Sequence, residues 1–357
     1  KYLAFFKNFY GIVKACIDYE RFVFITGVSK FCHVSLFSDL NNLTDITMSE
    51  DYATMFGYTQ EELEANFAAW IPEAAARQGV DASELLRRMK AWYDGYRFEA
   101  NCASVYNPVS VANFFINHGA FRNYWFETGT PSFLMRLIRE QRINVGSLVS
   151  EPMLPFVFDA FEIGDIHPLT LLLQTGYLTI KSSVEKLGRT KYMLDFPNQE
   201  VRESFNLYLL HDYAKQSKNE VGNFCEYLTD AVLEGDLARF MKTLEVFFAG
   251  IPYDVHHKSE ANFQNIFFAV FRLIGINVSA ESRTSDGRID AFIETDKSIW
   301  LFEFKLDGDV TALEQIRAKE YFKPYLLSGK DIAIIGVVFD TATGRLSDWK
   351  SEQVRLQ

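Results

Sequence analysis

The sequence predicts a multidomain protein of mixed α/β and α+β type, in which helical parts are followed by a small αβββαβ core. The chain has 357 residues, whereas a single domain usually has about 100–200. Hydrophobic residues make up 48% of the chain and aromatic residues 15%, which is enough to build packed cores. Apolar residues recur at helical spacing up to Gly250, and strand-like runs dominate the end. We expect four segments: 1–48, 49–196, 197–254 and 255–357.

The N-terminal segment predicts a helix followed by a strand. The helix is expected over Phe5 to Ile17, and a strand of β-branched and aromatic residues over Arg21 to Val28. Thr26 and Ser29 lie near the end of that strand, where nucleotide-binding α/β folds keep polar side chains. For either residue, an ordinary turn-capping role has even odds.

The chain lacks the sequence signature of a working ATPase. The phosphate-binding pattern G-x-x-x-x-G-K-[S/T] is absent from all 357 residues, and so is an apolar strand that ends in Asp-Asp or Asp-Glu. We therefore expect this chain alone not to hydrolyse ATP. ATP is expected as a cofactor only if the missing motifs lie upstream of Lys1, which would make the chain a fragment.

The middle segment, 49–196, is expected to be mostly helical. Thr59 and Glu62 form a capping-box pattern, and a second amphipathic helix is expected over Asp81 to Ala91. Aromatic residues with Gly and Pro predict turns that wedge helices together, and packing is favoured over ligand binding for these three motifs: Trp92–Tyr96, Val105–Ser110 and Tyr124–Pro131. Further on, a helix and a short strand around Gly176–Leu178 are expected within Leu169 to Ile180. With the segment from Tyr192 to Phe196, that strand would form a small hairpin of the winged-helix kind.

The connector, 197–254, is expected to be helical and packed. Its Leu, Tyr and Phe residues repeat at helical spacing, and Asp236 is the expected cap of the helix from Leu237 to Ala249. The segment is too apolar for a free linker, so we expect the C-terminal segment to dock on the middle segment.

The C-terminal segment, 255–357, carries the candidate chemistry. A strand from Ile289 to Glu294, a turn and a strand from Ser298 to Leu306 predict a hairpin. Glu303 and Lys305 share one face of the second strand, because side chains alternate along a strand. Burying two charges costs several kcal/mol unless a partner or metal compensates. Asp290 on the adjoining strand is the expected third member, and converging carboxylates beside an ammonium suit a hard divalent cation. An inert buried ion pair is the alternative.

Asp290 followed by Glu303-Phe304-Lys305 resembles the signature of the PD-(D/E)xK nuclease superfamily, with Ile289 where that family's leading proline stands. The resemblance implies a restriction-endonuclease-like core and Mg²⁺-dependent (or Mn²⁺-dependent) hydrolysis of phosphodiester bonds, in DNA rather than RNA. It assigns the remaining roles as follows: Asp290 and Glu303 as metal ligands assisted by Glu260, Lys305 as the group that positions water or stabilises the transition state, Gln315 as the residue that orients the site, and Arg283 and Arg288 as phosphate contacts.

The N-terminal strand and the aromatic motifs resemble a bacterial family in which an AAA-like ATPase domain precedes a PD-(D/E)xK domain. Residues 1–48 would then be the tail of the ATPase domain, with Thr26 or Ser29 in the place of the polar residue that senses the γ-phosphate of the nucleotide. The resemblance leaves a second function open, namely an ATPase-linked signalling or assembly protein whose nuclease-like domain only binds nucleic acid or protein.

The charge distribution and the cysteine content indicate which partner and which cellular compartment to expect. The net charge of −11 disfavours nucleic acid binding by the whole chain, but 13 Lys and Arg nearly balance 15 Asp and Glu from Val255 onwards. Phosphate binding depends on the electrostatic potential near the site and not on the net charge of the chain. Nucleic acid therefore stays the expected partner. Four scattered cysteines without metal-ligand spacing argue against zinc and favour the cytoplasm. No apolar run reaches the ~20 residues of a membrane span, and an oligomer is possible.

Overall fold

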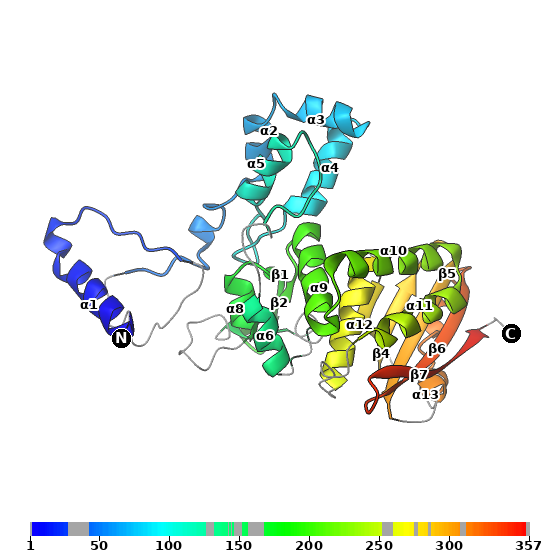
Figure 1. Ribbon diagram of the computed structural model, residues 1–357. Coiled ribbons are helices and arrows are strands. Elements are labelled where there is room, and N and C mark those ends of the chain that lie inside the picture. The colour runs from blue at the N-terminus through cyan, green and yellow to red at the C-terminus, as the bar shows by residue number, and fades with distance from the viewer. Residues whose placement is uncertain are drawn as a thin grey trace. The chain divides into compact units, whose positions relative to one another are not determined.

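The computed structural model describes residues 2–27, 43–125, 132–141, 143, 145, 152–155, 168–251, 260–274, 278–284, 287–307 and 312–354. The chain divides into two compact units (Figure 1). Unit 1 comprises residues 1–130 and 149–201, and unit 2 comprises residues 131–148 and 202–357. The finer boundaries predicted near residues 48, 196 and 254 stay predictions.

Unit 1 begins with the expected helix, α1 (Tyr2–Ala15), followed by a 3-10 turn, η1 (Ile17–Tyr19). The strand predicted from Arg21 is wrong over its described part, because residues 22–27 form no strand and Phe22 is 80% exposed. β-Branched and aromatic residues favour an extended backbone, but a strand exists only where a neighbour pairs with it. Residues 28–42, which include Ser29, lie outside the described residues.

A cluster of short helices forms the body of unit 1. A 3-10 turn, η2 (Glu50–Tyr52), is followed by α2 (Gln60–Asn66), α3 (Ile71–Gln78), α4 (Ala82–Tyr93) and α5 (Pro108–Ile116). The capping box of Thr59 and Glu62 is confirmed. The second predicted helix is confirmed too, but it extends through Trp92 and Tyr93, which were expected in a turn. Large apolar side chains at helical spacing fill the core: Leu63, Leu85, Met89, Tyr93, Val111 and Phe114.

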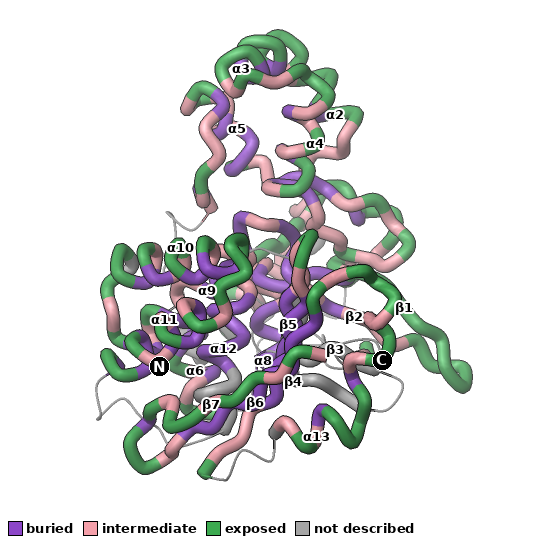
Figure 2. The backbone as a smooth tube through the Cα atoms, turned by 90° about the vertical axis from the view of Figure 1, so that its right-hand side faces the viewer, coloured by how far each residue is buried: buried purple, intermediate pink, exposed green. Residues whose placement is uncertain are grey.

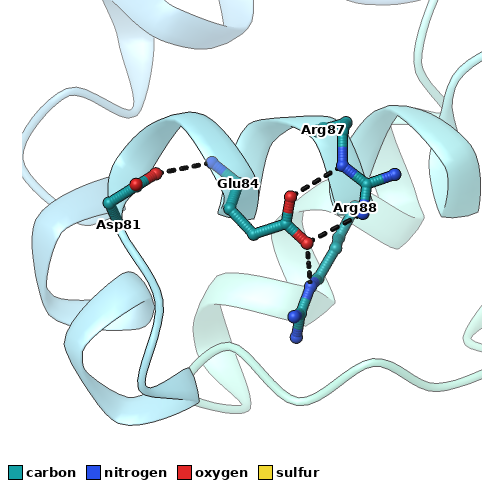
Figure 3. A network of polar contacts seen from close by, with 4 residues as sticks. All are labelled: Asp81, Glu84, Arg87 and Arg88. Carbon is teal, nitrogen blue, oxygen red and sulfur yellow. Dashed lines mark hydrogen bonds and ion pairs between the residues drawn. The ribbon is translucent and has the colours of Figure 1, made fainter.

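Helix α4 shows how polar side chains fix a helix start (Figure 3). Asp81 accepts a hydrogen bond from the backbone N–H of Glu84 at 2.8 Å, which satisfies a donor that the first turn leaves free. Glu84 in turn accepts from Arg87 Nε and Arg88 Nε, both at 2.7 Å. These hydrogen bonds, chiefly that from Arg87, hold the pKa of Glu84 at about 2. The network is exposed to solvent, so its role is to define the helix start.

The predicted helix and hairpin at the end of the middle segment are confirmed. Helix α8 (Pro168–Gln174) precedes strands β1 (Thr179–Lys186) and β2 (Arg189–Asp195), which pair antiparallel. The two turn residues, Leu187 and Gly188, both have positive φ, as a tight two-residue hairpin turn requires. A winged-helix assignment stays a prediction.

Three helices confirm that the predicted connector is helical: α9 (Gln199–Ala214), α10 (Lys218–Glu234) and α11 (Leu237–Ala249). Unit 2 contains α9 from Arg202 onwards, α10 and α11, and also the earlier helix α6 (Ser132–Glu140). Asp236 caps α11 as predicted, accepting from the backbone N–H of Arg239 at 2.9 Å. Within the described residues, no helix has both the length and the apolar character needed to cross a bilayer.

A five-stranded sheet follows, in the spatial order β3-β4-β5-β6-β7 among the described residues. The elements are α12 (Glu260–Ile274), β3 (Val278–Thr284), β4 (Gly287–Glu294), β5 (Ser298–Leu306), α13 (Ala312–Lys319), η6 (Lys323–Tyr325), β6 (Asp331–Asp340) and β7 (Arg345–Val354). β5 pairs antiparallel with β4 and parallel with β6. The predicted αβββαβ order is present, and β7 is an additional edge strand that the sequence reading missed.

Helices cover both faces of this sheet. On one face, Phe240 of α11 contacts Trp300 and Phe302 of β5, and Figure 1 shows α11 and α12 lying over the sheet. On the other face, Ile316 of α13 packs in a core with Leu301. Figure 2 shows β5 as a mostly buried strand. The central strand is therefore enclosed on both sides until its last residues.

Candidate active site

β5 carries the candidate site at its C-terminal end. Its alternate side chains point to opposite faces, because the strand is pleated. Phe304 stacks on Phe267 of α12, with ring centroids 4.2 Å apart. Lys305 instead contacts Gln315 on α13, which is the face that Leu301 shares with α13. The predicted division of this strand into an aromatic face and a charged face is confirmed.

Glu303 is a buried carboxylate beside an ammonium group. The residue is 3% exposed, and its Oε1 lies 3.4 Å from Lys305 Nζ. Attraction between opposite charges is stronger in a low-dielectric interior than in water. The ammonium therefore compensates part of the cost of burying this carboxylate.

Lys305 is held from two sides and still reaches solvent. Its Nζ donates to Gln315 Oε1 at 2.6 Å and to Glu303 at 3.4 Å. The side chain is 32% exposed, whereas that of Glu303 is 4% exposed. The ammonium thus has a fixed position at the edge of the buried site, where an incoming anionic group can meet it. Strand β5 and helix α13 together bring three of the predicted residues into one cluster.

The other predicted residues are placed by their backbone. The antiparallel pairing of β4 with β5 includes the pair Ala291 and Phe302, and Asp290 and Glu303 are the next residues beyond that pair on the two strands. Arg283 and Arg288 are register partners on β3 and β4. Glu260 is the first residue of α12. The side chains of all four lie outside the described residues.

The described side chains can be compared with the metal site and the nucleotide site that the sequence predicts. No group of three or more His, Cys, Asp or Glu able to hold a metal occurs among them. Thr26 is exposed and belongs to no strand, so the strand end expected to present it is not there. Ser29 lies outside the described residues.

Sequence reasoning missed a clamp at the end of β5. The backbone N–H of Asp307 donates to Phe339 O at 2.9 Å. The Asp307 carboxylate accepts from the Thr341 backbone N–H at 2.7 Å and also from the Thr341 hydroxyl. Asp307 has a φ of 49°, a conformation that Asp tolerates better than most residues. The clamp ties the strand end, two residues beyond Lys305, to the turn after β6, and a polar residue directly after an apolar strand was its sequence signal.

Comparison with known proteins agrees with this geometry. Residues 258–349 match the family model described as PD-(D/E)XK nuclease superfamily. The matched segment is a PD-(D/E)XK nuclease superfamily domain. It includes Glu260, Asp290, Glu303, Lys305 and Gln315, and its mixed sheet is consistent with that fold. Nucleases of this superfamily generally use divalent metals.

A relative extends the likeness over most of the chain. An uncharacterized protein in vnfD 5'region, from Azotobacter chroococcum mcd 1, is 36% identical over 342 residues. The alignment covers 93% of this chain but 63% of the relative, so the chain spans less than two thirds of that protein's length. No solved structure matches the chain. Because the PD-(D/E)XK match begins at residue 258, it does not test the predicted AAA-like tail at residues 1–48.

Proposed function

We propose that the PD-(D/E)XK domain hydrolyses phosphodiester bonds in nucleic acid with the help of a divalent cation, Mg²⁺ or Mn²⁺. The observation that carries the proposal is the cluster of Glu303, Lys305 and Gln315, formed by β5 and α13. A catalytically idle strand has no packing reason to bury a carboxylate beside a lysine.

One proposed ligand with a described side chain, Glu303, suits a hard cation. Glu303 supplies a buried carboxylate, the ligand type that Mg²⁺ prefers. Support for a second ligand is that Asp290 adjoins the Ala291–Phe302 pair of β4 and β5, and Glu260 opens the helix that precedes β3. We assign Asp290 and Glu303 as the residues that would hold the metal, with Glu260 assisting. A bound divalent cation would supply Lewis acidity toward a phosphate oxygen and lower the pKa of water.

The protein's own groups would orient and stabilise the reacting phosphate. Lys305 carries a positive charge that its two partners hold in place and that solvent can reach. Such a charge can position the attacking water or stabilise negative charge that develops on the phosphate. Gln315 accepts from the ammonium and so restricts where it points. Its role is to orient Lys305.

The substrate is proposed to be DNA rather than RNA, held by local positive charge. The C-terminal 103 residues from Val255 contain 13 Lys and Arg against 15 Asp and Glu, so this part is close to neutral although the chain carries −11. Arg283 and Arg288 are paired positions at the end of the β3–β4 hairpin. Two arginines at one hairpin end are suited to bind neighbouring phosphates.

A cleavage assay tests the proposal. Supercoiled plasmid DNA and a single-stranded RNA of mixed sequence are incubated with the protein in Mg²⁺, Mn²⁺ or EDTA. We expect nicking or linearisation of the DNA in metal but not in EDTA, and loss of that activity in Glu303→Gln. Equal cleavage by the parent and by Glu303→Gln would point to a contaminating nuclease and contradict the assignment.

A non-catalytic binding module is the second candidate. It is favoured by the contact of Glu303 with Lys305 at 3.4 Å, because opposite charges can compensate each other without a metal. In that case the domain binds DNA without metal-dependent cleavage, and Glu303 and Lys305 act as an ion pair. The proposed link to an AAA-like ATPase, the oligomeric state and a cytoplasmic location stay predictions. Micromolar binding of Mg-ATP by this chain, measured by calorimetry, would contradict the expectation that ATP requires upstream motifs.

A further inference from the structure

A second buried carboxylate, Glu200, lies in unit 1 and takes no part in the proposed reaction. It is the second residue of α9 and is fully buried, with 0% exposure. Its Oε2 accepts a hydrogen bond from Ser110 Oγ at 2.7 Å, and its Oε1 accepts from the backbone N–H of Trp125 at 2.8 Å. Ser110 is itself fully buried on α5. One carboxyl group therefore joins three segments that lie far apart in the sequence.

The aromatic motifs of the sequence meet around this carboxyl group. Burial is the main cause that raises the pKa of Tyr96, and the nearby charge of Glu200 adds to it. Gly95 has a φ of 112°, and the backbone of Pro197 passes close to it. A Cβ added at Gly95 would lie 2.0 Å from the Pro197 carbonyl oxygen. Only glycine fits such an approach. The predicted turn motifs thus have a packing role, and they enclose the start of α9.

The partners of Glu200 are neutral. Burial raises the pKa of its carboxyl from 4.5 to about 7, and the hydrogen bonds from Trp125, Ser110 and Tyr124 lower it only in part. No cation contributes to this shift within the described residues. An ionised carboxylate here is solvated by neutral donors alone, which is an unfavourable way to bury a charge.

We propose that Glu200 is a proton-operated latch of unit 1, tight when the carboxyl group holds a proton and loosened when it is ionised. Ser110 suits this role because a hydroxyl can donate to the carboxylate or accept from the carboxylic acid, whereas the Trp125 N–H can only donate. The latch holds the first turn of α9 to α5 and to the Tyr124–Trp125 segment. It rests on unit 1 alone and does not depend on the proposed nuclease reaction.

The titratable and charged groups around Glu200 do not account for the proposed change of charge near neutral pH. Burial raises the pKa of Tyr96 above its usual range, so this phenol stays neutral. The Tyr124 phenol donates to Ala120 O at 2.7 Å, and Asp94, the other described carboxyl group buried in this unit, accepts from Ser104 at 3.0 Å. The Lys181 ammonium donates to Pro197 O at 2.9 Å. Among these neighbours, Glu200 is the group whose pKa burial shifts towards neutral pH.

The sign of the effect follows from linkage. Because the folded-state pKa lies above the unfolded one, the unfolded chain binds fewer protons between pH 4.5 and about 7. Stability from this group is then present at low pH and is lost as pH rises through that window. With these two pKa values, the unfolding constant of unit 1 should rise about tenfold between pH 6 and pH 8.

The test compares the pH dependence of unfolding in the full-length parent and in Glu200→Gln. Denaturant unfolding of unit 1 is followed by hydrogen exchange of peptides covering α5 and the start of α9, after correction for intrinsic exchange. We expect the ratio of the two unfolding constants to change about tenfold between pH 6 and pH 8, because the amide does not titrate. A ratio that stays constant over this range would overturn the proposal.

A direct titration covers the case in which Glu200→Gln does not fold. The δ-carbons of glutamate are labelled with ¹³C in the parent, and their resonances are followed from pH 4 to pH 9. We expect one buried glutamate to titrate near pH 7, and its resonance to shift in Ser110→Ala, which removes the hydroxyl partner. If no resonance sensitive to Ser110→Ala titrates above pH 6, the latch does not exist.

Discussion

The two units each bury a glutamate, and the two sites differ in what faces the carboxyl group. Glu303 in unit 2 lies 3.4 Å from the ammonium of Lys305. Glu200 in unit 1 accepts from a hydroxyl and a backbone N–H, with no cation contributing within the described residues. Burial alone therefore does not make a catalytic site. The two glutamates differ in whether a positive charge faces the buried carboxyl group.

The sites also differ in access. Lys305 is 32% exposed at the end of β5, so a substrate phosphate can reach its ammonium group. Ser110, the corresponding partner of Glu200, is 0% exposed. The Glu303 site can meet a ligand, whereas the Glu200 site is closed to anything larger than a proton or water. This contrast predicts that substitution of Glu303 affects DNA cleavage, whereas substitution of Glu200 affects the pH dependence of unfolding.

The largest expected effect is on cleavage. Glu303→Gln should lower metal-dependent DNA cleavage about 100-fold or more, because it removes a ligand to a cation that supplies several kcal/mol of transition-state stabilisation. Glu294→Gln is the matched control, since Glu294 pairs with Lys330 at 2.7 Å in the same sheet and has no assigned role. Equal losses in the two variants would mean that general damage to the sheet, rather than chemistry, explains the result.

Each glutamate variant should leave unchanged the property that is assigned to the other glutamate. Glu200→Gln should keep full cleavage activity at a temperature where it is folded, whereas Glu303→Gln should keep the parent's rise in the unfolding constant of unit 1 between pH 6 and pH 8. Both assays are run on both variants. A loss of cleavage in folded Glu200→Gln would show that the two sites are not independent.

Removing the ammonium tests the charge balance at Glu303. Lys305→Ala should abolish cleavage and lower the free energy of unfolding by about 1–2 kcal/mol, less than for a fully buried pair because Lys305 is partly exposed. Mg²⁺ should recover part of that loss by providing another positive partner. The measurement is the melting temperature of parent and variant with and without Mg²⁺. A variant as stable as the parent would show that the lysine does not compensate the carboxylate.

Residues that only position Lys305 should have smaller effects. Gln315→Ala should lower kcat about tenfold, as loss of an orienting partner typically does. Asp307→Gly keeps the positive φ accessible and removes the clamp to Thr341, and it should lower kcat by less than about tenfold. In each variant KM should change little. A larger effect on KM than on kcat would assign these residues to substrate binding instead.

Local patterns predicted the site better than they predicted the edges of the fold. The faces of β5 follow from alternation, so the placement of Glu303 and Lys305 on one face could be predicted from the sequence. Gln315 was predicted only from the resemblance to the PD-(D/E)xK superfamily. The strand expected after Arg21 failed because local propensity cannot supply a pairing partner. β7 was missed because an exposed edge strand carries charged residues and shows little apolar alternation. Glu200 was missed because its burial is created by segments distant in sequence.

The most direct test of the central claim is whether Mg²⁺ binds at the carboxylates of β4 and β5. Calorimetric titration and thermal melting are performed on the parent, Asp290→Asn and Glu303→Gln. We predict that Mg²⁺ raises the melting temperature of the parent, and that each variant loses this stabilisation. Without metal, Asp290→Asn should be as stable as the parent or slightly more so, because like carboxylates at one site repel each other. If Mg²⁺ neither binds nor stabilises the parent, the site is an inert ion pair and the proposed nuclease activity is contradicted.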